Sequence, residues 1–222
     1  MKTWFITGTD TGAGKTVLAA LLAGQLHRQG VRVAALKPVC SGGRADAEAL
    51  FEALEGSLPL DTINPWFFRA AIAPLLAARR EKRAVTKKDL LAHIRRAGKG
   101  AAVTLVEGAG GLLSPLGVQV DSRDLIVALR ARPIIVAPNK LGVVNSLLLT
   151  LAALPPRARA EARVVFMAPE KPDPATGSNA ALLAEFFPAG RIFTLPWLGR
   201  RVSLPEAGRR AGVKKVLQDI AS

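Results

Sequence analysis

An apolar run followed by a glycine-rich loop and a helical pattern constrains this chain more than any other feature. The loop reads GTDTGAGKT from Gly8 to Thr16, between the apolar residues 4–6 and a predicted helix over 17–29. Glycines let backbone N–H groups converge on phosphate oxygens, and the N-terminus of the following helix adds a positive dipole. We therefore predict a phosphate-binding loop in which Lys15 reaches the terminal phosphates and the Thr16 hydroxyl binds Mg²⁺.

The spacing within the loop differs from the ordinary form of this motif. Five residues separate Gly8 from Gly14, whereas the ordinary motif has four. The longer loop is typical of a specialised branch of nucleotide-using proteins. The partitioning and septum-positioning ATPases of that branch carry a signature lysine where this chain has Asp10. Their nucleotide-sandwich dimer is therefore disfavoured.

The rest of the chain alternates short apolar runs with helical patterns. Continuous apolar runs are typical of strands that are buried on both faces of a parallel sheet. We predict strands at 4–6, 31–36, 103–106, 133–137, 164–167 and 192–195, and helices at about 17–29, 45–55, 87–97, 144–154 and 179–187. This alternation predicts a doubly wound α/β fold with a mostly parallel sheet, like that of P-loop NTPases. Residues 169–177 look like a surface loop and not a linker, so residues 1–222 should form a single domain.

Polar residues follow two of the predicted strands, and a third polar residue lies shortly beyond. In open α/β sheets, ligands collect at the carboxyl ends of the strands. Lys37 follows the second strand and would add positive charge to the phosphate site, and Glu107 follows the strand at 103–106, where a magnesium-binding carboxylate belongs. Asp46 opens a predicted helix. We expect Thr16, Asp46 and Glu107 to hold Mg²⁺; the plainer alternatives are a solvated lysine and a helix N-terminal carboxylate.

Several other chemistries are excluded or disfavoured. Cys40 is the only cysteine, so the chain has no internal disulfide and no metal–thiolate cluster, which indicates a reducing, cytoplasmic compartment. The longest apolar stretch, 141–154, is shorter than the roughly 20 residues of a membrane span. His27 and His93 fall within predicted helices among surface residues, and we expect both to face solvent.

A guanine-binding motif is also incomplete in this sequence. Asn139 and Lys140 follow a predicted buried strand, as the first residues of an Asn-Lys-x-Asp motif would. The fourth position is Gly142, so the carboxylate that accepts hydrogen bonds from guanine is missing. A GTPase is therefore disfavoured.

Four sequence blocks together resemble the dethiobiotin synthetase family. They are the loop 8–16, KPVCSG at 37–42, VEGAGGLL at 106–113 and KLGVVN at 140–145, and they occur in order over most of the chain. The resemblance implies ATP-dependent closure of a ureido ring from 7,8-diaminopelargonate and CO₂. One substrate amine forms a carbamate, ATP phosphorylates it, and the second amine attacks the carbamic-phosphoric mixed anhydride and releases phosphate.

The resemblance also implies a role for each matching residue. Lys37, Lys15 and Thr11 correspond to the catalytic group, and Thr16, Asp46 and Glu107 to the Mg²⁺ ligands. The implied nucleotide contacts are Gly12, Ala13, Gly14, Lys15, Thr16, Val17, Asp46, Glu107, Gly108, Ala109, Gly110, Pro196, Trp197, Leu198 and Glu206. The implied substrate contacts are Ser41, for an amine, and Gly142, Val143, Val144 and Asn145, a helix N-terminus that binds the substrate carboxylate across a homodimer interface.

One departure from the family concerns the base of the nucleotide. Dethiobiotin synthetases commonly carry an Asn-Asp pair that reads adenine after the strand that corresponds to 164–167. This chain has Met167-Ala168-Pro169-Glu170 there, with neither side chain of the pair. We therefore predict a relaxed nucleotide preference.

The alternative function is suggested by charge. Lys and Arg outnumber Asp and Glu by 31 to 17, a net charge of +14, and half of the residues are hydrophobic, enough for a core. Residues 79–99 hold nine basic residues against Glu81 and Asp89, a net charge of +7 outside every motif. A nucleotide-switched regulatory or nucleic-acid-binding protein would use such a surface, but a solvated helical face explains it more simply. The favoured partners are small molecules, with no membrane and no nucleic acid.

Overall fold

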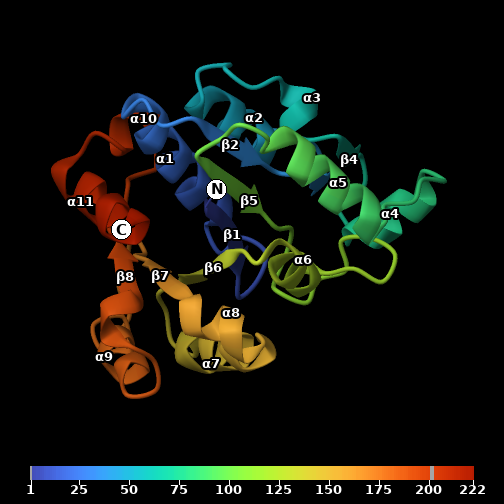
Figure 1. Cartoon of the computed structure of the whole chain (residues 1–222). Coiled ribbons are helices and arrows are strands. Elements are labelled where there is room, and N and C mark those ends of the chain that lie inside the picture. The colour runs from blue at the N-terminus through green and yellow to red at the C-terminus, as the bar shows by residue number, and fades with distance from the viewer. Residues whose placement is uncertain (1, 201–202) are drawn as a thin grey trace.

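A six-stranded sheet in the order β2-β5-β1-β6-β7-β8 forms the centre of the computed structural model, which describes residues 2–200 and 203–222 (Figure 1). Every neighbouring pair of these strands is parallel. The strands are β1 (Lys2–Gly8), β2 (Val33–Leu36), β5 (Val103–Glu107), β6 (Arg132–Pro138), β7 (Arg163–Met167) and β8 (Ile192–Leu195). The predicted parallel α/β fold is confirmed, and each predicted strand is present.

A second, two-stranded parallel sheet pairs β3 (Val39–Ser41) with β4 (Trp66–Phe68). The sequence did not predict these strands, because three residues are too few to show a period. β3 follows the edge strand β2 after only Lys37 and Pro38. The small sheet therefore begins where the main sheet ends.

Helices cover both faces of the main sheet (Figure 1). Five of the helices fall where the sequence predicted them, namely α1 (Lys15–Arg28), α2 (Ala45–Ala53), α5 (Lys87–Ala97), α7 (Val143–Ala153) and α9 (Asn179–Ala184). The other described helices are α3 (Leu60–Ile63), α4 (Pro74–Arg80), α6 (Ser122–Leu129), α8 (Pro156–Glu161), α10 (Leu204–Ala207) and α11 (Ala211–Ala221), together with one 3₁₀ turn at Ala189–Arg191. Segment 169–177 contains no helix or strand, as expected.

The two faces of the sheet bury two separate hydrophobic clusters. Successive residues of a strand point to opposite faces, and in β1 the side chain of Phe5 joins one cluster while Trp4 and Ile6 join the other. The Phe5 cluster packs against α4, α5, α6, α7 and α9, and the other cluster packs against α1, α2, α10 and α11. Each central strand is thus apolar on both faces, which is why the sequence shows continuous apolar runs.

The prediction for His93 is wrong. His93 is only 4% exposed, because it lies on the face of α5 that packs against the segment carrying α3 and β4. Its Nε2 lies 2.8 Å from the Thr62 carbonyl oxygen, and its ring meets Trp66 edge to face at 5.5 Å between centroids. His27 is half-buried near the end of α1. In the described residues no helix is long and apolar enough to cross a membrane.

Candidate active site

The phosphate loop connects β1, in the middle of the sheet, to α1. Gly12 and Gly14 adopt left-handed backbone conformations with φ of +74° and +95°, which side chains rarely adopt, so the loop depends on glycine at both positions. The Lys15 ammonium folds back over the loop and donates to the Asp10 carbonyl oxygen at 2.8 Å. α1 begins at Lys15 without a side-chain cap, so its first N–H groups stay available to an anion.

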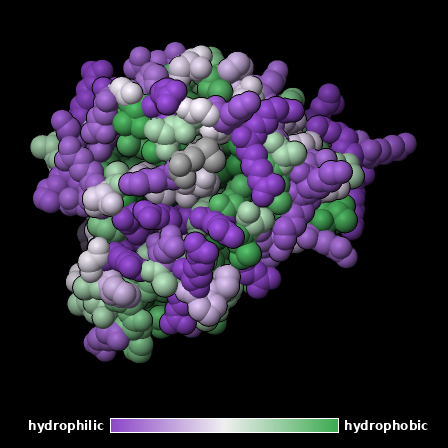
Figure 2. All heavy atoms as spheres, viewed as in Figure 1, coloured by the Kyte–Doolittle hydropathy of each residue, from purple (hydrophilic) through white to green (hydrophobic). Residues whose placement is uncertain are grey.

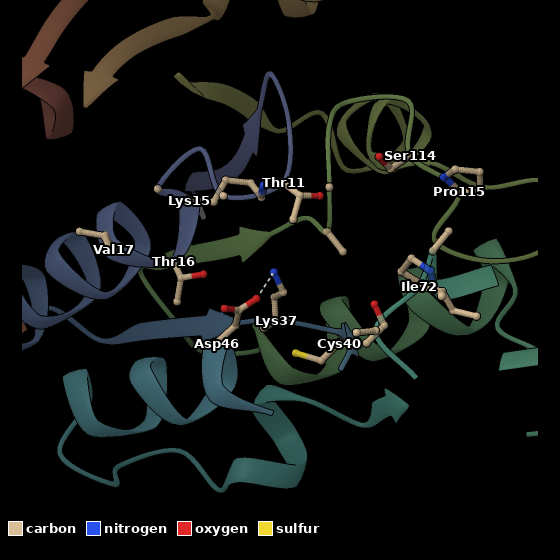
Figure 3. A pocket seen from close by; sticks show the side chains of 18 residues that line it. Thr11, Lys15, Thr16, Val17, Lys37, Cys40, Asp46, Ile72, Ser114 and Pro115 are labelled. Atoms are coloured by element: carbon tan, nitrogen blue, oxygen red, sulfur yellow. Dashed lines mark ion pairs between the residues drawn. The ribbon is translucent and has the colours of Figure 1, made fainter. Parts of the chain in front are cut away.

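A cavity of about 710 Å³ lies beside this loop at the carboxyl end of the sheet. In Figure 3, Thr11 and Lys15 lie on one side of the cavity, Lys37 and Asp46 on another, and Ile72 and Pro115 at its far end. Its other lining residues are Gly12, Gly14, Thr16, Val17, Cys40, Ser41, Ala71, Ala73, Pro74, Ala109, Gly110 and Ser114. The structure thus brings the loop, Lys37, Ser41 and Asp46 around one space large enough for a ligand.

Lys37 is buried between the two predicted metal-binding carboxylates. Its Nζ lies 2.7 Å from Glu107 Oε1 and 2.9 Å from Asp46 Oδ2, and it donates to the Gly108 carbonyl oxygen at 2.8 Å. Burial alone would lower the pKa of Lys37, but the charges of Glu107 and Asp46 outweigh burial and raise it above its ordinary value. Lys37 is therefore a fixed positive charge at the edge of the cavity.

The pKa values of the neighbouring Lys15, Glu107 and Asp46 are shifted by burial and by the charge of Lys37. Burial, and then the charge of Lys37, lower the pKa of Lys15. Burial raises the pKa of Glu107, although Lys37 opposes that rise. Burial also acts to raise the pKa of Asp46, but the charge and hydrogen bond of Lys37, with a hydrogen bond from Thr16, lower it. Two lysines that face one cavity repel each other, and an anionic ligand between them would relieve that repulsion.

One buried oxygen suggests where a metal would bind. Glu107 is 2% exposed, and its Oε1 accepts hydrogen bonds from Thr16 and Lys37, whereas its Oε2 has no hydrogen-bond partner. An unpaired buried carboxylate oxygen is costly and is the kind of ligand that Mg²⁺ prefers. Together with the Thr16 hydroxyl and Asp46 it makes an oxygen donor set that fits Mg²⁺. The parts of the chain that the structure describes contain no group of three or more His, Cys, Asp or Glu residues placed to hold a metal.

Other predicted site residues lie outside this cavity. Gly142 begins α7 with φ of +84°, and it and Asn145 are exposed, whereas Val143 and Val144 are buried in the core. None of these four residues lines the cavity, and neither do Ala13, Gly108, Pro196, Trp197, Leu198 or Glu206. The α7 N-terminus therefore has no contact with the cavity of its own chain. That arrangement is compatible with the expected contribution of a second subunit.

The loops after β7 and β8 lack the expected adenine-reading pair. Met167 lies against the phosphate loop, since a Cβ on Gly14 would meet its Cγ at 2.9 Å. The Glu170 carboxylate is paired with Arg200 at 2.8 Å, and Pro169 has no polar side chain. Trp197, after β8, is 46% exposed. Positions 167–170 therefore offer no side-chain amide, and their one carboxylate, Glu170, is an exposed group that pairs with Arg200.

The residues of the guanine-like motif serve the structure instead. Asn139 is 4% exposed; its Nδ2 donates to the Thr176 carbonyl oxygen at 3.0 Å, and its Oδ1 accepts from Asn179 at 2.8 Å. These bonds tie the loop after β6 to the loop after β7. The Asn139 side chain is therefore committed to hydrogen bonds within the protein.

Sequence reasoning missed one wall of the cavity. Ala71–Pro74 and Ser114–Pro115 line it from loops that lie far apart in the chain. Ser114 could have been suspected, because it follows the glycine-rich run after Glu107; its hydroxyl accepts from the Gly111 N–H at 2.9 Å. Cys40 also lines the cavity, but burial raises the pKa of its thiol to about 12, which leaves it unreactive.

Comparison with known proteins identifies a matching family model and several relatives that carry the same name. A family model described as an AAA domain matches residues 2–202. The ATP-dependent dethiobiotin synthetase BioD of Anaeromyxobacter dehalogenans (strain 2CP-C) is 39% identical over 95% of this chain and 94% of its own length. Proteins of the same name from Akkermansia muciniphila and Cellvibrio japonicus are each 35% identical, over 84% and 89% of this chain and 88% and 90% of their own lengths.

Solved structures share the fold at low identity. The MinD cell division protein of Aquifex aeolicus superposes with a TM-score of 0.55 at 14% identity, over 100% of this chain and 96% of that chain. Its complex with MinC gives a TM-score of 0.56 at 13% identity. At these identities the likeness concerns the fold alone.

Proposed function

The chain belongs to the ATP-dependent dethiobiotin synthetase family, and we propose that its cavity closes a ureido ring on 7,8-diaminopelargonate with CO₂ and ATP. The observation that carries this proposal is the position of Lys37. A buried, protonated lysine lies at the edge of a cavity that is lined by the phosphate loop and Asp46, and this lysine pairs with both Asp46 and Glu107. This arrangement suits a reaction between two anions, a carbamate and a nucleotide triphosphate.

The proposed chemistry needs charge neutralisation and positioning more than acid or base catalysis. A substrate amine adds to CO₂ to give a carbamate, whose oxygen attacks the terminal phosphorus while the nucleoside diphosphate leaves. The second amine then attacks the carbonyl carbon of the mixed anhydride, and phosphate leaves as the ring closes. A carbamate is a weak nucleophile, so fixed positive charges that act on both anions lower the barrier.

Residues in and beside the cavity would each have a separate role in this reaction. Lys15 and the N–H groups of the phosphate loop would bind the terminal phosphates, and Lys37 would stabilise the charge on the transferring phosphoryl group. Ser41, which lines the cavity, would contact a substrate amine. Thr16, Asp46 and Glu107 would hold Mg²⁺, which when bound neutralises phosphate charge. The apolar wall formed by Ala71–Pro74 is suited to an alkyl chain.

A second subunit would complete the site. The α7 N-terminus, with the exposed residues Gly142 and Asn145, would bind the substrate carboxylate of a partner in a homodimer. Leu141, just before α7, and Leu149, in the second half of α7, are 79% and 64% exposed, which supports an interface along this helix. We also propose a cytoplasmic location, which is supported by the single, buried Cys40.

The test is a phosphate-release assay that requires all three substrates. We expect release only when diaminopelargonate, bicarbonate and ATP with Mg²⁺ are present, together with formation of dethiobiotin detected by mass. Release that continues at the same rate without the diamine would contradict the proposed function.

The base preference is a separate prediction for this site. Because residues 167–170 carry neither side chain of the adenine-reading pair that the family has there, we expect turnover with CTP or GTP to lie within about tenfold of turnover with ATP. The measurement is kcat/KM for each nucleotide in the same assay. A preference for ATP by several orders of magnitude would show that the backbone of these loops, or another residue, reads adenine.

A further inference from the structure

Lys37 lies at a place where the main sheet gives its backbone no support. It follows the edge strand β2 and precedes β3, and neither β2 nor β3 includes it. Its N–H donates to the Ile63 carbonyl oxygen at 3.0 Å, and its own carbonyl oxygen accepts from Asn64 Nδ2 at 2.8 Å. The last residue of α3 and the residue after it therefore hold the Lys37 backbone through both its N–H and its carbonyl oxygen.

Asn64 is buried completely and uses both ends of its side chain. Nδ2 also lies within hydrogen-bond reach of the carbonyl oxygens of Pro38 at 3.3 Å and Trp66 at 3.2 Å. Oδ1 accepts from Arg44 Nε at 3.3 Å, and the Asn64 carbonyl oxygen accepts from Arg44 Nη2 at 2.9 Å. Because Asn64 is 0% exposed, removal of its amide would deprive several buried polar groups of their hydrogen-bond partner.

Arg44 links this amide to the other side of the Lys37 cluster. It immediately precedes α2, the helix that presents Asp46 to Lys37 in Figure 3. Its guanidinium also pairs with Asp61 at 2.8 Å and lies 4.3 Å from the centre of the Phe67 ring. One buried amide thus joins the backbone of Lys37 to the start of the helix that carries its partner carboxylate.

From these contacts we propose that Asn64 is a positioning residue for Lys37. It fixes where the Lys37 backbone leaves β2, so that the ammonium reaches Glu107, Asp46 and Gly108 together. A displacement of about 1 Å in such a group costs as much as 10²-fold in rate. The proposal rests on the proposed function in one respect, namely that Lys37 is the lysine beside the transferring phosphate.

The first test observes Lys37 without any substrate. In ¹⁵N-labelled protein, a buried ammonium with three acceptors should give a distinct, slowly exchanging ¹⁵Nζ signal, assigned by its loss in Lys37→Ala. We expect Asn64→Ala to broaden or shift this signal. The control is Ile63→Ala, which creates a cavity in the same segment but keeps the carbonyl oxygen that accepts from the Lys37 N–H. In this variant the ¹⁵Nζ signal should be unchanged. An unchanged signal in Asn64→Ala would overturn the proposal, whether or not the protein has the proposed activity.

The second test is a double-mutant cycle on turnover. We expect Asn64→Ala to lower kcat about tenfold or more while KM for MgATP changes less than about threefold, and to have no further effect in a Lys37→Ala background. Ile63→Ala should lower thermal stability by a similar amount with kcat within about twofold of the parent. Two results would show that Asn64 has a structural role only. One is an equal loss of kcat from Asn64→Ala in the parent and in the Lys37→Ala background, and the other is a loss of kcat from Ile63→Ala as large as that from Asn64→Ala. Absence of diamine-dependent release in the parent protein would contradict the proposed function and leave the decision on Asn64 to the ¹⁵Nζ signal.

Discussion

Lys37 offers three N–H donors, and all three have acceptors within the protein, namely Asp46 Oδ2, Glu107 Oε1 and the Gly108 carbonyl oxygen. A lysine with so little freedom costs no reorganisation when charge develops beside it, which is the condition for electrostatic catalysis. At this scale the sequence singled out Lys37 and Glu107 by their positions at strand ends, and the structure brings these two charges together. The sequence could not identify Asn64 or Arg44, since a buried amide and a helix-preceding arginine carry no motif.

Lys37→Ala should lower turnover by at least ~10²-fold, the magnitude of losing one positioned electrostatic stabiliser. The fold should survive, because Glu107 can take up a proton once its partner is gone, as burial already raises its pKa. The measurement is the phosphate-release assay, with circular dichroism to check the fold. Lys99→Ala, an exposed lysine of the basic segment, is the matched control. Turnover near that of the parent would remove Lys37 from the mechanism.

At the scale of the elements, the buried His93 holds α5 against the segment of α3 and β4. Burial, and the charge of Arg96, lower the pKa of His93 below its ordinary value of 6.5, while its hydrogen bond to Thr62 opposes them. The His93 ring contacts Arg96, whose Nη2 lies 3.3 Å from Nδ1, and the uncharged residues Thr62 and Trp66. The helix was predicted correctly, but which of its faces is buried depends on α3 and β4, which the sequence did not predict.

The free energy of unfolding should depend on pH through His93. Because the pKa is lower in the folded chain, the unfolded chain takes up a proton first, so stability is full above about 6.5 and falls as the pH drops below it. One proton gives a slope of at most about 1.4 kcal/mol per pH unit. Urea titrations at several values between about pH 5 and 7 give the free energy of unfolding, and hence this slope. Asp46 and Asp124, whose pKa values are lowered from an ordinary value of 3.8, change the free energy of unfolding only at lower pH.

His93→Gln keeps an N–H donor for Thr62 and removes the titration, so it should flatten this slope. His27→Gln, which changes the half-buried histidine of α1, is the control and should keep it. An equal slope in His93→Gln and the parent protein would assign the pH dependence to other groups.

At the scale of the whole molecule, half of the net charge of +14 lies in residues 79–99, none of which lines the cavity. In Figure 2, the side of the molecule that carries α4 and α5 in Figure 1 is covered largely by hydrophilic residues. Several of its basic side chains have partners: Lys87 pairs with Asp124 at 3.1 Å, and the Arg83 guanidinium lies 4.9 Å from the centre of the Phe68 ring. α5 buries one face and exposes its charges on the other, which supports the interpretation as a solvated surface.

The exposed apolar side chains of Leu141, just before α7, and Leu149, within α7, lead to a prediction about assembly. The protein should have about twice the chain mass by light scattering, and Leu149→Glu should shift it toward the monomer and lower turnover, because a charge is costly in a buried apolar interface. Leu76→Glu, at a leucine of α4 that is 50% exposed, is the matched control and should change neither property. A monomeric parent protein with full activity would rule out a shared site.

The sequence alone determined the six strands of the main sheet, five of the helices, the phosphate loop and the strand-end positions of Lys37 and Glu107. It could do so because apolar runs, glycine spacing and strand-end positions are local properties. The tertiary structure decided what non-local contacts control: the pairing of β3 with β4, the burial of His93, the apolar wall at Ala71–Pro74, and the support of Lys37 by Asn64. These features depend on which segments meet across the fold, and no single stretch of sequence contains that information.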